Sequence, residues 1–248
     1  MTRLAIRLLG PFEVTLDGEP ITQFETLKTR ALLAYLAVTG VRHNRDTLAT
    51  LLWPEKGQSS ARAELRRGLY FINKALGNHW LAANLETIGL NPELNTSSGA
   101  ELWLDLAVFQ QQLKTCEDHK HSATDTCPDC IPHLEAAVDL YTDHFMAGFS
   151  LPDCPEFDEW QFFQTQGLKD EFAGVLERLP GELRPDVLMR VARLEMIDPA
   201  AMEELDRELN PYGVPSFPSV AVTGEGVFEA FEKVSEMLDR ELTPRRSD

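Results

Sequence analysis

One stretch, residues 59–76, restricts the fold of this chain more than any other, because its apolar and charged side chains separate when projected on a helix. The apolar face of that helix would consist of Ala61, Leu65, Leu69, Ile72 and Leu76. The opposite side would carry Arg66, Arg67, Tyr70 and Lys74, with Arg62 on the flank. Ser59 or Ser60 can serve as N-cap, and Gly77 lies where a helix would end. Such a helix is typical of DNA recognition, and also of ordinary helices on a protein surface.

The segments around this helix supply its context. Alternating apolar side chains predict strands, and a period of 3.6 residues predicts helices. In chain order the expected elements are strands at 4–8, 12–16 and 20–23, helices at 27–38, from 44–46 to Pro54 and at 59–76, and a hairpin of 80–82 with 85–90. Strands, three helices and a hairpin in this order predict a winged helix-turn-helix domain over residues 1–98. The last helix of that fold enters the major groove of double-stranded DNA.

Five segments carry a resemblance to a known family. They are LLGPFEV (8–14), LKTRALLAYLAV (27–38), DTLATLLWPE (46–55), SSARAELRRGLYFINKALG (59–77) and ETIGLNPE (86–93). Residues 1–178 resemble bacterial antibiotic-regulatory-type transcriptional activators, in which a winged helix precedes a bacterial transcriptional activation domain. The resemblance implies that the helix at 59–76 contacts DNA through Arg62, Arg66, Arg67, Tyr70 and Lys74. The expected wing, residues 81–86, contains neither Arg nor Lys, so we expect only modest DNA affinity.

The second half of the resemblance concerns residues 99–180. Helical periodicity begins at Trp103 and recurs at 133–148 and 156–179. The resemblance implies stacked helix pairs of the tetratricopeptide kind, in a truncated copy of the activation domain, which serve contacts with other proteins. The expected fold class is therefore α+β, mostly α.

The charge of the chain also differs between its N-terminal and C-terminal parts. The formal net charge is −17, but residues 1–95 hold 11 Lys/Arg and 9 Asp/Glu, a net of +2, and the rest holds −19. Phosphate contacts therefore belong to the first 95 residues. The acidic remainder favours a protein partner, RNA polymerase or another transcription protein. The sequence leaves open whether the regulator acts as a homodimer.

A cluster of cysteines and histidines lies between the first two helices of the second region. Cys127 and Cys130 form a Cys-x2-Cys pair, and Cys116 with a nearby histidine, His133, could complete a tetrahedral zinc site. Reduced thiols without a metal are the alternative, and no other cofactor is expected.

Residues 181–248 resemble other families than residues 1–178 do. Residues 182–209 are similar to a helical stretch of the flagellar motor switch protein G, and 209–243 to the C-terminal strand, loop and helix of Ras-like gliding-motility GTPases. The sequence lacks a G-x4-G-K-[ST] loop, so we expect no GTPase activity. A helical hairpin followed by a strand and a helix is expected, and the patchwork of families suggests a recombined chain.

Two functional hypotheses arise from these features. The first is a DNA-binding transcriptional activator with residues 59–76 as its recognition helix. The alternative is a helical protein-interaction adaptor, linked to signalling or motility, that no longer binds DNA. No paired acid and base or phosphate-binding loop supports an enzyme. No signal peptide or apolar run of membrane-spanning length is present, so a cytoplasmic protein without membrane contact is expected.

Overall fold

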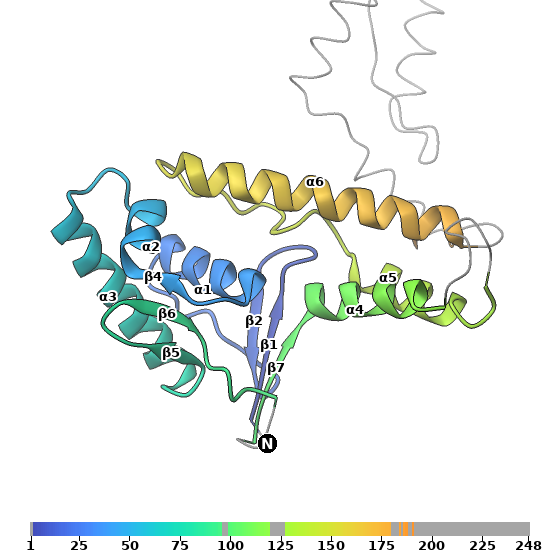
Figure 1. The fold of residues 1–248 in the computed structure, drawn as a ribbon, viewed down its shortest axis with the longest axis horizontal. Coiled ribbons are helices and arrows are strands. Elements are labelled where there is room, and N and C mark those ends of the chain that lie inside the picture. Colours follow the sequence, from blue (N-terminus) through green and yellow to red (C-terminus); the bar gives the residue numbers. More distant parts are fainter. Residues whose placement is uncertain are drawn as a thin grey trace, which may run out of the picture. The chain divides into compact units, whose positions relative to one another are not determined.

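A computed structural model describes residues 2–95, 99–119 and 127–179, together with residues 184, 186, 187 and 190 (Figure 1). Residues 1–180 form one compact unit, and 181–248 form a second. The described sheets and long helices all belong to the first unit. The hairpin, strand and helix expected in the tail lie outside the described residues.

The N-terminal strands form a four-stranded sheet with the order β3-β2-β1-β7. Strands β1 (Thr2–Arg7) and β2 (Glu13–Leu16) are antiparallel, as predicted, whereas β3 (Glu19–Pro20) is shorter and earlier than predicted. Strand β7 (Ala100–Leu104), which was not predicted, pairs in parallel with β1. The sheet thus extends across the domain boundary expected at residue 98.

Three helices come after the first strands. Helix α1 (Leu27–Thr39) begins at a Thr26 N-cap and ends at Gly40, whose φ of 63° favours glycine. Helix α2 (Arg45–Leu52) is capped by the Asn44 side chain, which accepts from the Asp46 N–H. Helix α3 (Gln58–Leu76) begins at Gly57 without a side-chain cap, so the predicted serine cap is wrong.

A second, three-stranded sheet has the order β4-β6-β5. Strands β5 (Leu81–Ala83) and β6 (Thr87–Leu90) form the predicted antiparallel hairpin. The Asn84 side chain holds its turn by accepting from the backbone N–H groups of Glu86 and Thr87. Strand β4 (His43–Asn44), which was not predicted, pairs with β6 and so attaches the hairpin to the start of α2.

Three further helices complete the unit: α4 (Asp105–Glu117), α5 (Ile131–Leu140) and α6 (Pro155–Arg178). The helix predicted at 133–148 is wrong beyond Leu140. There the chain turns back on the first strands, and the N–H groups of Thr142 and Met146 donate to the carbonyls of Leu9 and Leu8. Phe145 stays buried, but from an extended segment rather than a helix.

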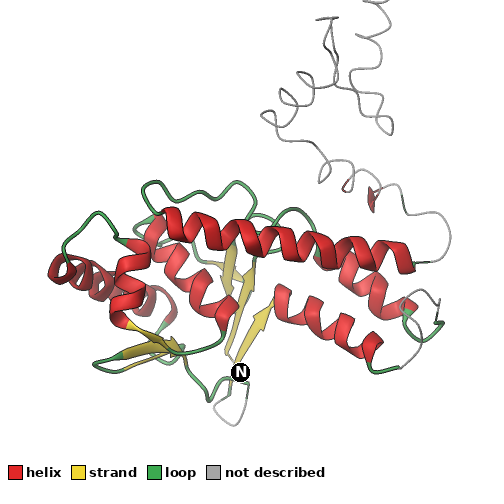
Figure 2. Ribbon diagram, turned by 45° about the horizontal axis from the view of Figure 1, so that its top comes forward, coloured by secondary structure: helices red, strands yellow, loops and turns green. Residues whose placement is uncertain are grey.

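Helix α6 runs from α2 to the α4–α5 pair in both ribbon views (Figures 1 and 2). Near its first end, the Trp160 ring lies 4.9 Å from the Tyr35 ring of α1, centroid to centroid. Further along, the Phe172 ring stacks on Tyr141 at 4.3 Å. One long helix therefore packs against both the N-terminal helices and the second region.

Candidate nucleic-acid interface

The apolar face of α3 fixes the orientation of the helix. All five apolar residues predicted for it are buried, among them Leu65 and Ile72 with no exposed surface. Burial of each of the leucine and isoleucine side chains on this face contributes about 1.5–3 kcal/mol to folding. Because that face is held against the core, the opposite face of α3 is directed to solvent.

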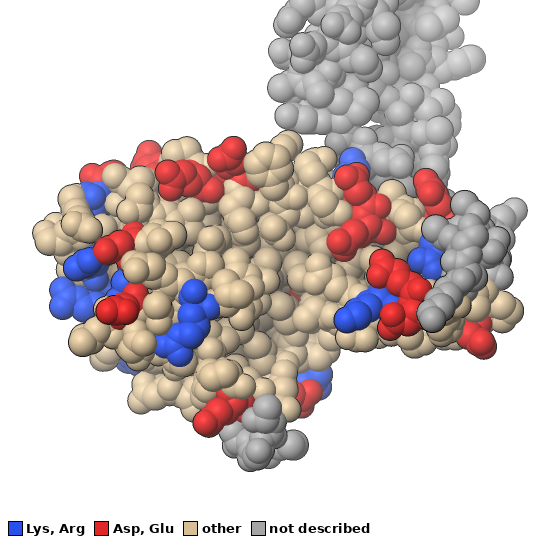
Figure 3. Space-filling view, viewed as in Figure 1, with Lys and Arg blue, Asp and Glu red and all other residues tan. Residues whose placement is uncertain are grey.

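An open groove of about 920 Å³ lies along the exposed face of α3. It runs between α3, the start of α2 and the β5–β6 hairpin. Its charged and aromatic lining consists of Arg45, Asp46, Arg62, Arg66, Tyr70 and Glu86. In Figure 3 the blue side chains at the end of the molecule that holds α2 and α3 are interspersed with red ones. The groove is therefore basic but not uniformly so.

Three of the five predicted DNA-contacting residues line this groove. Arg66 is exposed and has no carboxylate partner among the described residues. The Tyr70 ring is 60% exposed. Arg62 lies closest to α2 and pairs with the Asp46 carboxylate. The hydrogen bond from Arg62 lowers the pKa of Asp46, so this carboxylate stays charged at neutral pH.

The other two predicted residues do not line the groove. Arg67 pairs with Glu25 at 2.8 Å, and its guanidinium lies 5.5 Å from the centroid of the Phe71 ring. The reason is geometric, since consecutive residues of a helix are turned by about 100° and Arg67 therefore faces away from Arg66. Lys74 is exposed on α3 outside the groove lining.

Two arginines that the sequence reasoning did not select lie against the hairpin. The Arg45 Nε donates to the Asn84 carbonyl at 2.7 Å, and the Arg42 Nε donates to the Thr87 hydroxyl at 3.1 Å. Both flank β4, so the pairing of β4 with β6 brings them to the β5–β6 hairpin. The hairpin lacks its own basic residues, but its neighbour in the sheet supplies them.

Arg45 and Arg66 both line the groove, and the charge of Arg66 acts on Arg45. Partial burial and, secondly, the charge of Arg66 lower the pKa of Arg45. Arg66 is exposed and Arg45 is only partly buried, but two like charges repel each other, and an anion bound beside both would relieve that repulsion. The groove can therefore bind a phosphate group or the acceptor edge of a base.

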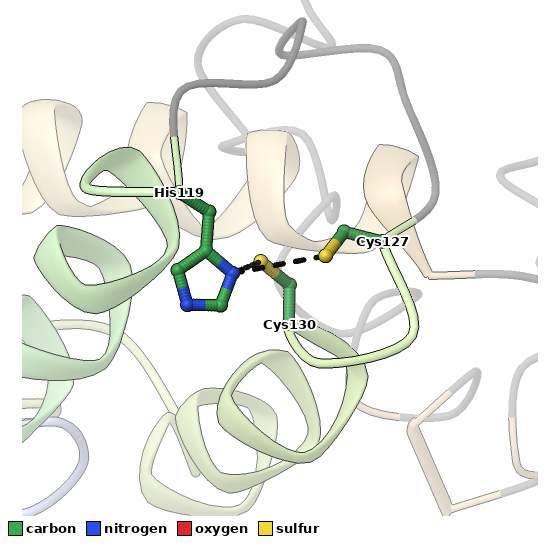
Figure 4. A group of neighbouring side chains, drawn as sticks. All are labelled: His119, Cys127 and Cys130. Carbon is green, nitrogen blue, oxygen red and sulfur yellow. Dashed lines mark hydrogen bonds between the residues drawn. The ribbon is translucent and has the colours of Figure 1, made fainter.

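The predicted zinc ligands are only partly brought together. Cys127 and Cys130 lie beside His119 (Figure 4). The His133 Nδ1, in contrast, is 2.6 Å from the Gln112 side-chain oxygen. Cys116 is buried next to Cys130, and its thiol approaches the Cys130 carbonyl at 3.8 Å. The histidine that lies beside Cys127 and Cys130 is thus His119, whereas the predicted ligand His133 contacts Gln112 instead.

No helix among the described residues is both long and apolar enough to cross a membrane.

Comparison with known proteins gives two kinds of similarity. The chain is 41% identical over 76 residues to the transcriptional regulatory protein EmbR of Mycobacterium tuberculosis and of Mycobacterium bovis. That alignment covers 30% of this chain and 19% of the relatives. A structure of Mycobacterium tuberculosis EmbR in complex with a low-affinity phosphopeptide matches with a TM-score of 0.53 and 26% identity. The match covers 86% of this chain and 52% of that one, so this chain spans about half of its structural relative. Separately, residues 168–211 match the FliG middle domain.

Proposed function

We propose that this chain is a DNA-binding transcriptional regulator of the activator type, in which α3 enters the major groove and the β5–β6 hairpin lies against the neighbouring backbone. The observation that carries the proposal is the open groove along α3, whose lining includes Arg45 and the exposed Arg66. An α-helix fits the major groove of B-form DNA, and an arginine that projects from it can donate to a guanine edge or to phosphate.

The similarity to EmbR supports the same function. The relatives named as transcriptional regulatory proteins align with 76 residues of this chain. A structure of one of them matches 86% of this chain. The aligned part makes up 19% of the relatives, so the proposal concerns the DNA-binding role alone.

Two arginines adjacent in sequence allow a sharp test of the proposal. Arg66→Ala and Arg67→Ala remove the same charge from neighbouring positions of one helix, but only Arg66 lines the groove. We expect R66A to weaken binding of the full chain to duplex DNA by about 5- to 100-fold, the range for the loss of one good arginine contact. R67A should weaken binding by less than about threefold, because general charge attraction changes little.

The measurement is fluorescence anisotropy of labelled duplexes, first of random sequence and then from a promoter library of the source genome, at several salt concentrations. If Arg66 contacts phosphate, R66A reduces the slope of log K against log salt by about 0.9. Equal affinities of wild type and R66A at low salt would contradict the proposed interface. If R67A and R66A lose the same DNA affinity, the loss comes from the change in net charge and not from a contact made by Arg66.

The helices beyond residue 104 are proposed to contact RNA polymerase or another transcription protein. The acidic balance of the residues after 95 supports this role, because an acidic surface does not compete for DNA. A protein-interaction adaptor without DNA binding is the second candidate. It is favoured by the ion pairs of Arg62 with Asp46 and of Arg67 with Glu25, which neutralise two of the basic side chains on α3. Absence of salt-dependent DNA binding in the wild-type chain would select the adaptor.

A further inference from the structure

A second cluster of reactive side chains lies far along the chain from α3, where α4 ends and α5 begins. The His119 Nδ1 is 3.3 Å from the Cys130 Sγ and 3.7 Å from the Cys127 Sγ (Figure 4). All three ligand atoms lie within 4.8 Å of one another. The proposed DNA interface does not use any of these residues.

The separations match those of ligands around one zinc ion. Zinc binds cysteine sulfur at about 2.3 Å and histidine nitrogen at about 2.0–2.1 Å in a tetrahedral arrangement, so sulfur and nitrogen ligands lie about 3.6 Å apart. The two measured separations of 3.3 and 3.7 Å lie on either side of this value.

The sequence spacing supplies a fourth ligand. Cys116 and His119 are three residues apart at the end of α4, and Cys127 and Cys130 are three apart before α5, which gives the pattern Cys-x2-His-x7-Cys-x2-Cys. Two such pairs, one from each side of a loop, are the usual spacing in structural zinc sites. The Cys116 thiol already lies against Cys130, and the Cys130 thiol in turn approaches the Cys116 carbonyl at 4.0 Å.

The surroundings of the thiols agree with this chemistry. Cys116 and Cys130 are buried, whereas His119 is exposed and Cys127 partly exposed, so the cluster is open to solvent on one side only.

We propose that Cys116, His119, Cys127 and Cys130 bind one zinc ion, which fastens the end of α4 to the start of α5. The histidine ligand replaces His133, which is held by Gln112. The role is structural, because four protein ligands leave no coordination position for a substrate. The ion would cross-link α4 to α5, the helix that packs against α6, and its binding free energy would add to the stability of that region.

Two histidine variants test the ligand set in the full chain. His119→Ala removes a proposed ligand, and His133→Ala removes the histidine on the other side of the loop. Wild type and H133A should each retain about one zinc per chain by elemental analysis after dialysis against a weak chelator, whereas H119A should bind at least about tenfold more weakly. Circular dichroism confirms that each variant is folded.

Cobalt substitution then tests the cysteines. Co²⁺ in the wild-type chain should show the strong visible absorption of a tetrahedral site together with sulfur-to-cobalt charge transfer. The charge-transfer intensity should fall to roughly two-thirds in Cys116→Ser or Cys127→Ser, because one of three thiolates is lost. The proposal is overturned if wild type binds less than about a tenth of an equivalent of zinc under reducing conditions, or if H133A loses zinc as H119A does. An unchanged cobalt spectrum in C116S removes Cys116 from the site.

Discussion

At the residue scale, Asp105 joins the two halves of the first unit. Its buried carboxylate accepts from the N–H groups of Leu8 and Leu9, at 2.7 and 2.8 Å, and also caps the N–H of Leu106. Only 2% of the residue is exposed. The end of β1 is thereby attached to the start of α4 by one side chain.

Removal of this carboxylate should destabilise the unit. Asp105→Ala leaves the buried N–H donors of Leu8, Leu9 and Leu106 without this acceptor, and each such loss costs about 1–3 kcal/mol. We expect the free energy of unfolding to fall by about 3 kcal/mol, measured by urea denaturation at neutral pH. A change below about 1 kcal/mol would mean that water replaces the carboxylate without cost.

The same carboxylate should also give stability a pH dependence of defined sign. Burial raises the pKa of Asp105, against the smaller opposing effect of the backbone donors. Between its ordinary pKa of about 3.9 and the raised value, the folded chain holds a proton that the unfolded chain has lost. The contribution of Asp105 to stability is therefore fully present below about pH 4 and is lost as pH rises through the raised pKa.

Asp105→Asn, which cannot titrate, should remove this component. Urea denaturation from about pH 4 upward measures the difference in free energy of unfolding between wild type and D105N. That difference should change with pH only between the ordinary pKa of Asp105 and its raised value. A constant difference would show that the pKa of Asp105 is not raised.

At the scale of elements, helices were predicted better than strands. Helix α1 is bounded by local signals, a Thr26 cap and Gly40, and α2 by Asn44 and Pro54, so each could be delimited from its own residues. Strands β4 and β7 carry no such signal. They are strands because β6 and β1 offer them unpaired edges, and β1 lies almost a hundred residues from its partner β7.

The residues of the candidate interface also divide into those that local sequence signals could predict and those that depend on long-range pairing. Arg62, Arg66 and Tyr70 could be selected from helical periodicity, because residues four apart share a face. The contribution of Arg45 depends on β4 and could not be read from the sequence. His119 could have been found, because its spacing from Cys116 repeats that of Cys127 from Cys130. Whether any of these residues binds DNA or zinc stays a prediction.

Helix α6 depends on Trp160 for its packing near α1. The ring contacts Tyr35, Phe145 and Phe157 at centroid distances between 4.9 and 5.7 Å. Trp160→Ala should lower the free energy of unfolding by about 3 kcal/mol, the low end for a tryptophan because the side chain is half-buried. The exposed Phe163→Ala on the same helix is the matched control and should cost under about 1 kcal/mol in chemical denaturation. Similar losses in both variants would argue against packing of Trp160.

At the scale of the whole molecule, residues 1–180 should behave as one cooperative unit. A fragment of residues 1–98 lacks β7, the Asp105 acceptor and α6, and leaves one edge of β1 unpaired. We expect this fragment to show no cooperative thermal transition, whereas residues 1–180 should retain one by circular dichroism. A fragment 1–98 that melts like 1–180 would restore the domain boundary that the sequence suggested.

The parallel pairing of β1 with β7 also bears on synthesis in the cell. Strand β1 leaves the ribosome well before its partner, which is translated almost a hundred residues later. Loop closure over that length is slow, and a waiting strand edge can pair with other chains. The helices α1 to α3 are translated in the interval, before β7 can pair with that edge. The order in which the strands leave the ribosome therefore matters for the folding of this sequence, in addition to the packing of the finished unit.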